Sequence, residues 1–314
     1  MIQQPIKEYI PQRGYISPFI QFLTLVGITG VGLIVFTAIA AGIILALFGL
    51  KTLINTFGFN TQDPHVGVAL WILQIVSTTM PLFIAPVIFA RFIVQQPQEY
   101  LKPTFKFTPV LLAIIFSIMA FSMPIMEVLS NINQKLVLPH ALKGLEDWMR
   151  SAEQAAQKAT EAMLHMNNLW DMLWAVFVVG LLTAIAEEFL FRGVVQTIFL
   201  KSTKNKHAAI WITAILFSAF HMEFFSFLPR VFLGAVFGYF VAYSGSIWTG
   251  VWAHFLNNSS AVVITYLYQH KSTKLDPDDQ HVFNLGAYAF SLIIVLFLLF
   301  VYRKVAMDKK LALN

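Results

Sequence analysis

Two adjacent glutamates, Glu187 and Glu188, stand in an apolar stretch that is long enough for a membrane helix. A charged side chain at membrane depth costs at least about 2.5 kcal/mol on insertion scales, so such residues predict a functional site with a partner. Arg192 follows Glu188 by four residues, in the order that favours an ion pair on one helix face. Glu187 is rotated by about 100° from Glu188 and has no such partner on its own helix. A buried carboxylate of this kind suits a general base or a proton carrier.

Two further polar motifs lie on apolar segments downstream of the glutamates. His221 follows Phe217 by four residues, and His254 precedes Asn258 by four, so that the last two share a helix face. With a rise of about 1.5 Å per residue, Glu187, His221, His254 and Asn258 all lie about 12–20 Å from the helix ends predicted on one side of the membrane. Polar groups at comparable depth on three helices indicate one site.

These residue types support two kinds of chemistry. A glutamate beside a histidine can deprotonate a water, and a second histidine with an asparagine can stabilise the oxyanion of a tetrahedral intermediate. That set is suited to the hydrolysis of an amide. Alternatively, Glu187, His221 and His254 can ligate a divalent metal such as zinc, which needs three protein ligands and an open position. The residues leave both possibilities open.

Several other protease designs are absent from the sequence. No His-Glu-x-x-His zinc motif, Gly-x-Ser-Gly nucleophile loop or Gly-x-Gly-Asp aspartyl motif occurs. The chain has no cysteine, which excludes disulfides, a cysteine nucleophile and thiolate metal ligands. A glutamate with histidines is the design that remains.

The composition predicts an all-α, polytopic membrane helix bundle. The chain is 58% hydrophobic and 12% charged and contains 30 Phe, which is too apolar for a soluble protein. Only helices and closed barrels satisfy their backbone in lipid, and short alternating strands are missing. About eight transmembrane helices are expected, over residues 19–50, 66–92, 109–130, 170–200, 208–227, 229–245, 247–268 and 284–302.

The basic residues indicate how the bundle is oriented. They cluster at the ends of apolar segments, as topology signals do, and the net charge of +5 therefore does not predict a nucleic-acid partner. Both termini are predicted in the cytoplasm, with the protein integral to the cell (inner) membrane. The first apolar run is too long for a cleaved signal peptide. The basic residues on the cytoplasmic side are Lys7, Arg13, Arg91, Lys102, Lys106, Lys201, Lys204, Lys206, Arg303, Lys304, Lys309 and Lys310.

One loop, over residues 131–168, is predicted to contain an amphipathic extramembrane helix, because apolar residues repeat there at three- and four-residue steps. It can pack on the membrane surface or on the bundle, or it can act as a lid or docking element for substrate. No repeat or separate soluble domain is present. Residues 1–314 are therefore predicted to form a single membrane domain with a catalytic core at about 170–268.

Taken together, the motifs Glu187-Glu188-x-x-x-Arg192, Phe217-x-x-x-His221 and His254-x-x-x-Asn258 resemble those of the CPBP intramembrane proteases. This is the CaaX-protease and bacteriocin-processing group, which includes the type II CaaX prenyl endopeptidases, so the resemblance leaves open a CaaX prenyl protease or a bacteriocin- or peptide-processing enzyme. The resemblance implies an endopeptidase that cleaves a peptide or lipidated peptide in contact with membrane lipid. It implies that Glu187 activates water and His221 positions it, that His254 and Asn258 form the oxyanion hole, and that Glu188 and Arg192 support the site. Whether zinc takes part stays open.

Two hypotheses of other classes compete with the protease. The buried carboxylates can serve a proton-coupled transporter, although the chain shows no repeated halves or paired broken helices of the kind that transporters have. Alternatively, the fold can serve without catalysis, as a membrane scaffold or immunity factor. The complete set of Glu187, His221, His254 and Asn258 favours the protease.

Overall fold

The computed structural model describes residues 16–136, 138–273 and 282–312, and these residues form helices and turns without any strand. The prediction of an all-α membrane protein is therefore confirmed. Lys7 and Arg13, which were assigned to the cytoplasmic side, lie outside the described residues.

Each of the predicted apolar segments is helical. The first is α1 (Pro18–Phe57), and the second consists of α2 (Val66–Ile72), the π-helical segment Leu73–Thr79, α3 (Met80–Ile88) and a π-helical end at Phe89–Ile93. The third is α5 (Val110–Gln134). The fourth consists of α7 (Leu169–Ala175), α8 (Thr183–Glu188) and α9 (Gln196–Thr203), joined by the π-helical segments Val176–Leu182 and Phe189–Val195. The last four are α10 (Lys206–Phe220), α11 (Phe227–Ser244), α12 (Ile247–Gln269) and α13 (Leu285–Ala312). Two further helices connect the earlier segments: the short α4 (Pro97–Leu101) follows the second, and the longer α6 (Lys143–Met163) follows the third.

Six helices among the described residues are long and apolar enough to cross a membrane, two fewer than the eight segments expected. The two that fail carry the histidine motifs. Helix α10 has only 15 residues, and the polar side chains of α12, such as His254 and Asn258, lower its mean hydropathy. Both helices pack against neighbours inside the bundle. The features that mark the site therefore also weaken the membrane signal of these helices.

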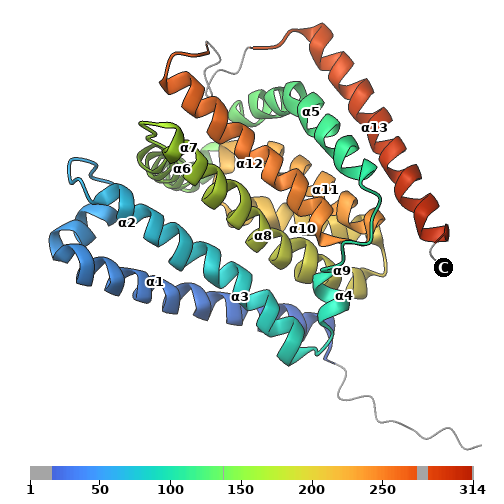
Figure 1. Cartoon of the computed structure of the whole chain (residues 1–314), viewed down its shortest axis with the longest axis horizontal. Helices are drawn as coiled ribbons and strands as arrows, with labels where there is room; N and C mark the ends of the chain where they lie inside the picture. Colours follow the sequence, from blue (N-terminus) through green and yellow to red (C-terminus); the bar gives the residue numbers. More distant parts are fainter. Residues whose placement is uncertain (1–15, 137, 274–281, 313–314) are drawn as a thin grey trace, which may run out of the picture.

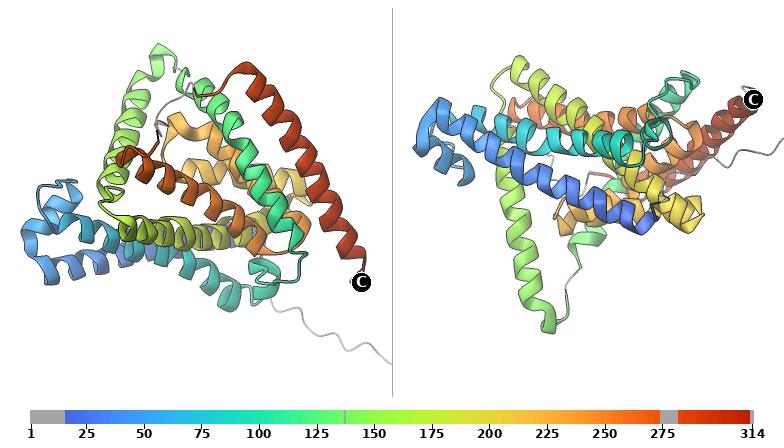
Figure 2. Two further views of the ribbon diagram at one scale, coloured as in Figure 1. Left: turned by 45° about the horizontal axis from the view of Figure 1, so that its top comes forward. Right: turned by 90° about the horizontal axis from the view of Figure 1, so that it is seen from below.

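The helices form two groups that flank the motif-bearing core (Figure 1). Helix α1 runs beside the rod formed by α2 and α3 on one flank, and α5 packs against α13 on the other. Between these flanks lie α8, α9, α10, α11 and α12, with α12 crossing the π-helical segment Val176–Leu182. Figure 2 shows the same arrangement from two further directions. The core that holds the glutamates thus has helices on both sides.

Two helix ends differ from the prediction. Helix α1 continues to Phe57 through a kink at Gly49, whose φ of 82° is accessible to glycine. Helix α10 stops at Phe220, although the apolar run was expected to continue as helix to residue 227. Met222 has a left-handed φ of 57°, which reverses the chain there before a short 3-10 turn begins at Phe224. Sequence hydropathy does not detect such a turn because mostly apolar residues flank it on both sides.

The amphipathic helix predicted within residues 131–168 is present as α6. None of its residues is buried, and the helix projects from the bundle (Figure 2). It is joined to the body through the turn after α10 and through contacts with α2. Helix α6 therefore stands apart from the bundle and touches it at a few points.

Short loops fix the ends of the core helices. The backbone N–H of Ile247, at the start of α12, donates to the carbonyl of Lys102 at 3.0 Å. The Lys102 ammonium in turn donates to Thr197 Oγ1 on α9 at 2.5 Å. Desolvation of this amine lowers its pKa to about 8. One loop residue thus joins α9 to α12.

Small residues on α11 let it approach the helix of the glutamates closely. Gln196 Nε2 donates to the carbonyl of Gly238 at 3.3 Å. A Cβ at Gly238 would lie 2.7 Å from Gln196 Oε1 and 2.9 Å from Ile210 Cγ2. Glycine pairs spaced by four residues, here Gly234 and Gly238, are typical of close contacts between membrane helices.

We expect Gly238→Ala to destabilise the bundle by about 1–3 kcal/mol, because overpacking forces neighbouring side chains out of place. Gly27→Ala is the matched control, since a Cβ at Gly27 meets no atom within 4 Å. Unfolding of both variants in a titration with SDS measures the difference. Equal stability of the two variants would show that α11 does not depend on this close approach.

Candidate active site

Glu187 and Glu188 end α8, between the π-helical segments Val176–Leu182 and Phe189–Val195. Both side chains are buried, with 6% and 0% of their residue surfaces exposed. A π-helical turn inserts an extra residue into a helix, so it changes which side chains face a given neighbour, and such turns are frequent at functional sites. The insertions on either side of α8 thus help to set the direction of the two carboxylates.

Glu188 and Arg192 form the ion pair that their spacing predicted. Arg192 Nη1 lies 2.7 Å from Glu188 Oε1, and neither side chain has any exposed surface. Arg192 Nη2 also donates to the carbonyl of Gly234 on α11 at 3.1 Å. The guanidinium carbon lies 4.3 Å from the ring centre of Phe217 and 5.4 Å from that of Phe237. The buried charge of Arg192 is therefore surrounded by a carboxylate, a carbonyl and two aromatic faces.

His254 lies between the two glutamates. Its Nδ1 is 2.9 Å from Glu188 Oε1, and its Nε2 is 3.7 Å from Glu187 Oε2. Since a carboxylate accepts hydrogen bonds, the Nδ1 atom carries the proton in this contact. The ring stacks on Phe237 with centres 5.2 Å apart, and only 5% of the side chain is exposed. The Glu188 carboxylate and the Phe237 ring together fix the orientation of this imidazole.

His221 approaches Glu187 from another helix. It is the first residue after α10, whereas the sequence placed it within a continuous helix. Its Nδ1 contacts the carbonyl of Phe217 at 2.8 Å, and its Nε2 lies 3.7 Å from Glu187 Oε2. The side chain is 23% exposed, compared with 5% for His254. His221 is therefore the more accessible of the two imidazoles beside Glu187.

One oxygen atom, Glu187 Oε2, thus faces the Nε2 atoms of both His221 and His254. It is buried and has no hydrogen-bond partner among the described residues. Because each Nδ1 faces an acceptor, a neutral ring directs an unprotonated Nε2 toward the carboxylate. The Glu187 oxygen and the two Nε2 atoms are then three hydrogen-bond acceptors that face one another without a donor. A water molecule between them would supply the missing donor. The geometry suits a water held between Glu187 and the two rings.

Asn258 lies one turn from His254 on α12, as the spacing predicted. Its amide donates to the carbonyl of Val179 at 3.1 Å, within the π-helical segment before α8, and its own oxygen accepts from Asn257 Nδ2 at 3.2 Å. The structure describes no contact between Asn258 and Glu187. One proton of the Asn258 amide remains for another acceptor, and a role in the oxyanion hole stays a prediction.

Glu187, His221 and His254 are the residues that would hold a metal ion at this site. The part of the chain that the structure describes contains no group of three or more His, Cys, Asp or Glu side chains placed to hold a metal ion.

Two contributors to the site carry no recognisable signal in the sequence. Phe237 packs against both Arg192 and His254, but it is one aromatic residue among many. Gly250 on α12 makes room for Glu188, since a Cβ there would lie 2.7 Å from Glu188 Oε2. A glycine four residues before His254 is the only available hint of this contact.

The turn that follows His221 is held from outside the bundle by α6. The backbone N–H of Phe225 donates to Glu153 Oε2 at 2.9 Å, and the Arg150 guanidinium lies 4.2 Å from the ring centre of Phe225. On the other side, Asn133 of α5 accepts from the N–H of Leu228 at 2.7 Å. Helix α6 and α5 thus fix the chain just beyond the exposed imidazole.

Comparison with known proteins bears on the same part of the chain. Residues 168–260 match the family described as "Type II CAAX prenyl endopeptidase Rce1-like". The chain is also similar to the uncharacterized protein YpbD of Bacillus subtilis (strain 168), with 28% identity over 106 residues, which cover 32% of this chain and 50% of YpbD. The chain thus spans about half the length of this relative. No solved structure matches the chain.

Removal of Arg192 should unfold the site. We expect Arg192→Met to destabilise the protein by about 3–5 kcal/mol, because it leaves Glu188 charged and buried without its partner. Adding Glu188→Gln removes that charge and keeps an acceptor for His254 Nδ1, so the double variant should regain part of the loss. Titration with SDS measures both. A double variant no more stable than Arg192→Met would contradict this account of the pair.

Removal of the Glu153 carboxylate should loosen the turn after His221. We expect Glu153→Ala to speed hydrogen exchange at the Phe225 amide by about tenfold, as for a lost hydrogen bond to a charged group. Glu161→Ala, at an exposed position of α6, is the matched control and should leave this amide unchanged. Equal exchange at Phe225 in the two variants would show that Glu153 does not hold the turn.

Proposed function

We propose that this chain, which belongs through residues 168–260 to the Rce1-like family of type II CAAX prenyl endopeptidases, is an intramembrane endopeptidase that hydrolyses a peptide bond with water activated by Glu187. The observation that carries the proposal is the position of Glu187 Oε2, buried and 3.7 Å from the Nε2 atoms of both His221 and His254. The chain is an integral membrane protein, and the reaction would take place within its helix bundle.

In the first step, Glu187 takes a proton from a water molecule held between its carboxylate and the imidazoles. The oxygen of that water forms a bond to the carbonyl carbon of the peptide, and the carbonyl oxygen becomes an oxyanion. His221, the more exposed ring, is the side chain best placed to orient the water toward an entering peptide. Proximity of base, water and substrate lowers the entropic part of the barrier.

In the second step, the tetrahedral intermediate collapses. The carbon–nitrogen bond breaks, and the amine leaves with the proton that Glu187 had taken from water, so that one water is consumed and an acid and an amine are released. His254 donates to the oxyanion when its Nε2 is protonated as well as its Nδ1, and the second amide proton of Asn258 is the other donor suggested by the family resemblance.

Glu188 and Arg192 act through His254 rather than on the substrate. Glu188 Oε1 contacts both the guanidinium of Arg192 and the Nδ1 of His254. Glu188 Oε1 accepts the Nδ1 proton of His254 at 2.9 Å, so the carboxylate fixes the direction in which the ring points. The ion pair is therefore proposed as the support that keeps His254 oriented.

The proposed substrate is a peptide, or a lipidated peptide such as one ending in a prenylated cysteine. The family description names a prenyl endopeptidase, and the buried position of Glu187 suits a chain that enters the helix bundle from the membrane. The proposed location is the cell membrane, with both termini in the cytoplasm, following the distribution of basic residues.

Peptide cleavage by the purified protein in liposomes tests this function. With a fluorogenic library that includes prenylated peptides, we expect Glu187→Gln to lower kcat by about 100-fold or more, the contribution of a positioned general base. His221→Ala should lower kcat as well, because the water is then no longer oriented toward the peptide. Glu161→Gln, on the exposed face of α6, is the matched control and should retain full activity.

A chelator is added in a parallel assay. Loss of cleavage in the chelator would show that a divalent metal, and not the Glu187 carboxylate alone, activates the water. Full activity in chelator supports water activation by Glu187 alone. Cleavage that persists undiminished in both Glu187→Gln and His221→Ala would show that the catalytic site lies elsewhere.

A further inference from the structure

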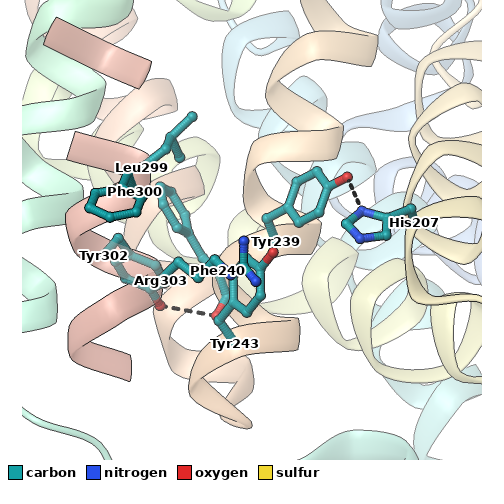
Figure 3. A pocket seen from close by; sticks show the side chains of 8 residues that line it. All are labelled: His207, Tyr239, Phe240, Tyr243, Leu299, Phe300, Tyr302 and Arg303. Carbon is teal, nitrogen blue, oxygen red and sulfur yellow. Dashed lines mark hydrogen bonds between the residues drawn. The ribbon is translucent and has the colours of Figure 1, made fainter. Parts of the chain in front are cut away.

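A concave site lies between α11 and α13, beside the start of α10 (Figure 3). Its volume is about 330 Å³, at the lower end of the range for small-molecule sites. It opens where α11 approaches its end at Ser244 and α10 begins at Lys206, the side predicted to be cytoplasmic. The lining residues are His207, Tyr239, Phe240, Tyr243, Leu299, Phe300, Tyr302 and Arg303.

Most of the wall of this groove is apolar. Leu299 and Phe300 belong to the candidate membrane span Leu285–Asp308, and Phe300 is 63% exposed. Two tyrosine hydroxyls are already engaged, since Tyr302 donates to the carbonyl of Phe240 at 3.0 Å and Tyr239 contacts His207 Nδ1 at 2.7 Å (Figure 3). The groove thus continues from the lipid-facing surface of α13 toward the aqueous side.

The aqueous end of the groove is positively charged. The Arg303 guanidinium lies 5.7 Å from the ring centre of Tyr243, and the Lys206 ammonium lies 4.3 Å from the same ring. No acidic residue lines the groove, and the described residues include no salt bridge to Arg303. An anion at this end of the groove would be attracted by the charge of Arg303.

We propose that this groove binds an anionic phospholipid. The phosphate would contact Arg303 and Lys206, and an acyl chain would lie along Leu299 and Phe300. Basic pockets between membrane helices on the cytoplasmic side recognise such headgroups through charge. A soluble phosphate compound satisfies the cations but leaves the apolar wall unused, so the combination of both surfaces favours a lipid. The site is independent of the proposed protease, since none of its lining residues contacts Glu187.

Native mass spectrometry of the full chain in micelles tests the proposal, with titration of phosphatidylglycerol or phosphatidylcholine as the probe. We expect phosphatidylglycerol to bind the wild type more tightly than phosphatidylcholine. Arg303→Gln should weaken phosphatidylglycerol about fivefold, the factor for one basic residue at an anionic membrane surface. Lys304→Gln removes the same charge from the next position, outside the groove, and should change binding less than about twofold.

A second variant blocks the groove without changing its charge. Leu299→Trp should reduce phosphatidylglycerol binding to the level of phosphatidylcholine while the helical circular dichroism stays as in the wild type. Inorganic phosphate should not displace the lipid. Equal weakening by Arg303→Gln and Lys304→Gln, undiminished binding to Leu299→Trp, or displacement by inorganic phosphate would each overturn the proposal.

Discussion

The Glu188–Arg192 ion pair is the interaction on which the centre of this protein depends. A charge in an apolar helix bundle must be paired and hydrogen-bonded, because desolvation otherwise costs several kcal/mol per ion. Arg192 meets this need with the carboxylate of Glu188, the carbonyl of Gly234 and the rings of Phe217 and Phe237. These partners come from three different helices, so the pair determines how α10 and α11 pack around the helix of the glutamates.

The same pair connects structure with the proposed chemistry. Glu188 Oε1 contacts Arg192 and also His254 Nδ1, so the oxygen that neutralises the arginine orients an imidazole beside Glu187. Glycines make this possible, since a side chain at Gly250 would collide with Glu188 and one at Gly234 would approach Arg192 Nη2 to 3.3 Å. This arrangement of charges therefore requires small residues on the helices that face it.

The two imidazoles beside Glu187 are held in different ways. His254 is buried in the body of α12 and fixed by Glu188 and Phe237. His221 stands at the end of α10, before a turn that Glu153 of α6 holds. A rigid buried group and a more exposed one at a helix end suit a site where one side chain is preorganised and the other meets an incoming ligand. Helix α6 is thus linked to the site through the backbone.

The sequence by itself determined the helical segments, because hydrophobic length and the cost of buried charge act locally along the chain. It also determined the Glu188–Arg192 pair and the shared face of His254 and Asn258, which follow from helical spacing. Only the tertiary structure decided that α10 ends before His221, that Glu188 contacts His254, and that Phe237, Gly250 and Glu153 surround the site. These features depend on which faces of separate helices meet, and that is settled by packing between residues far apart in the chain.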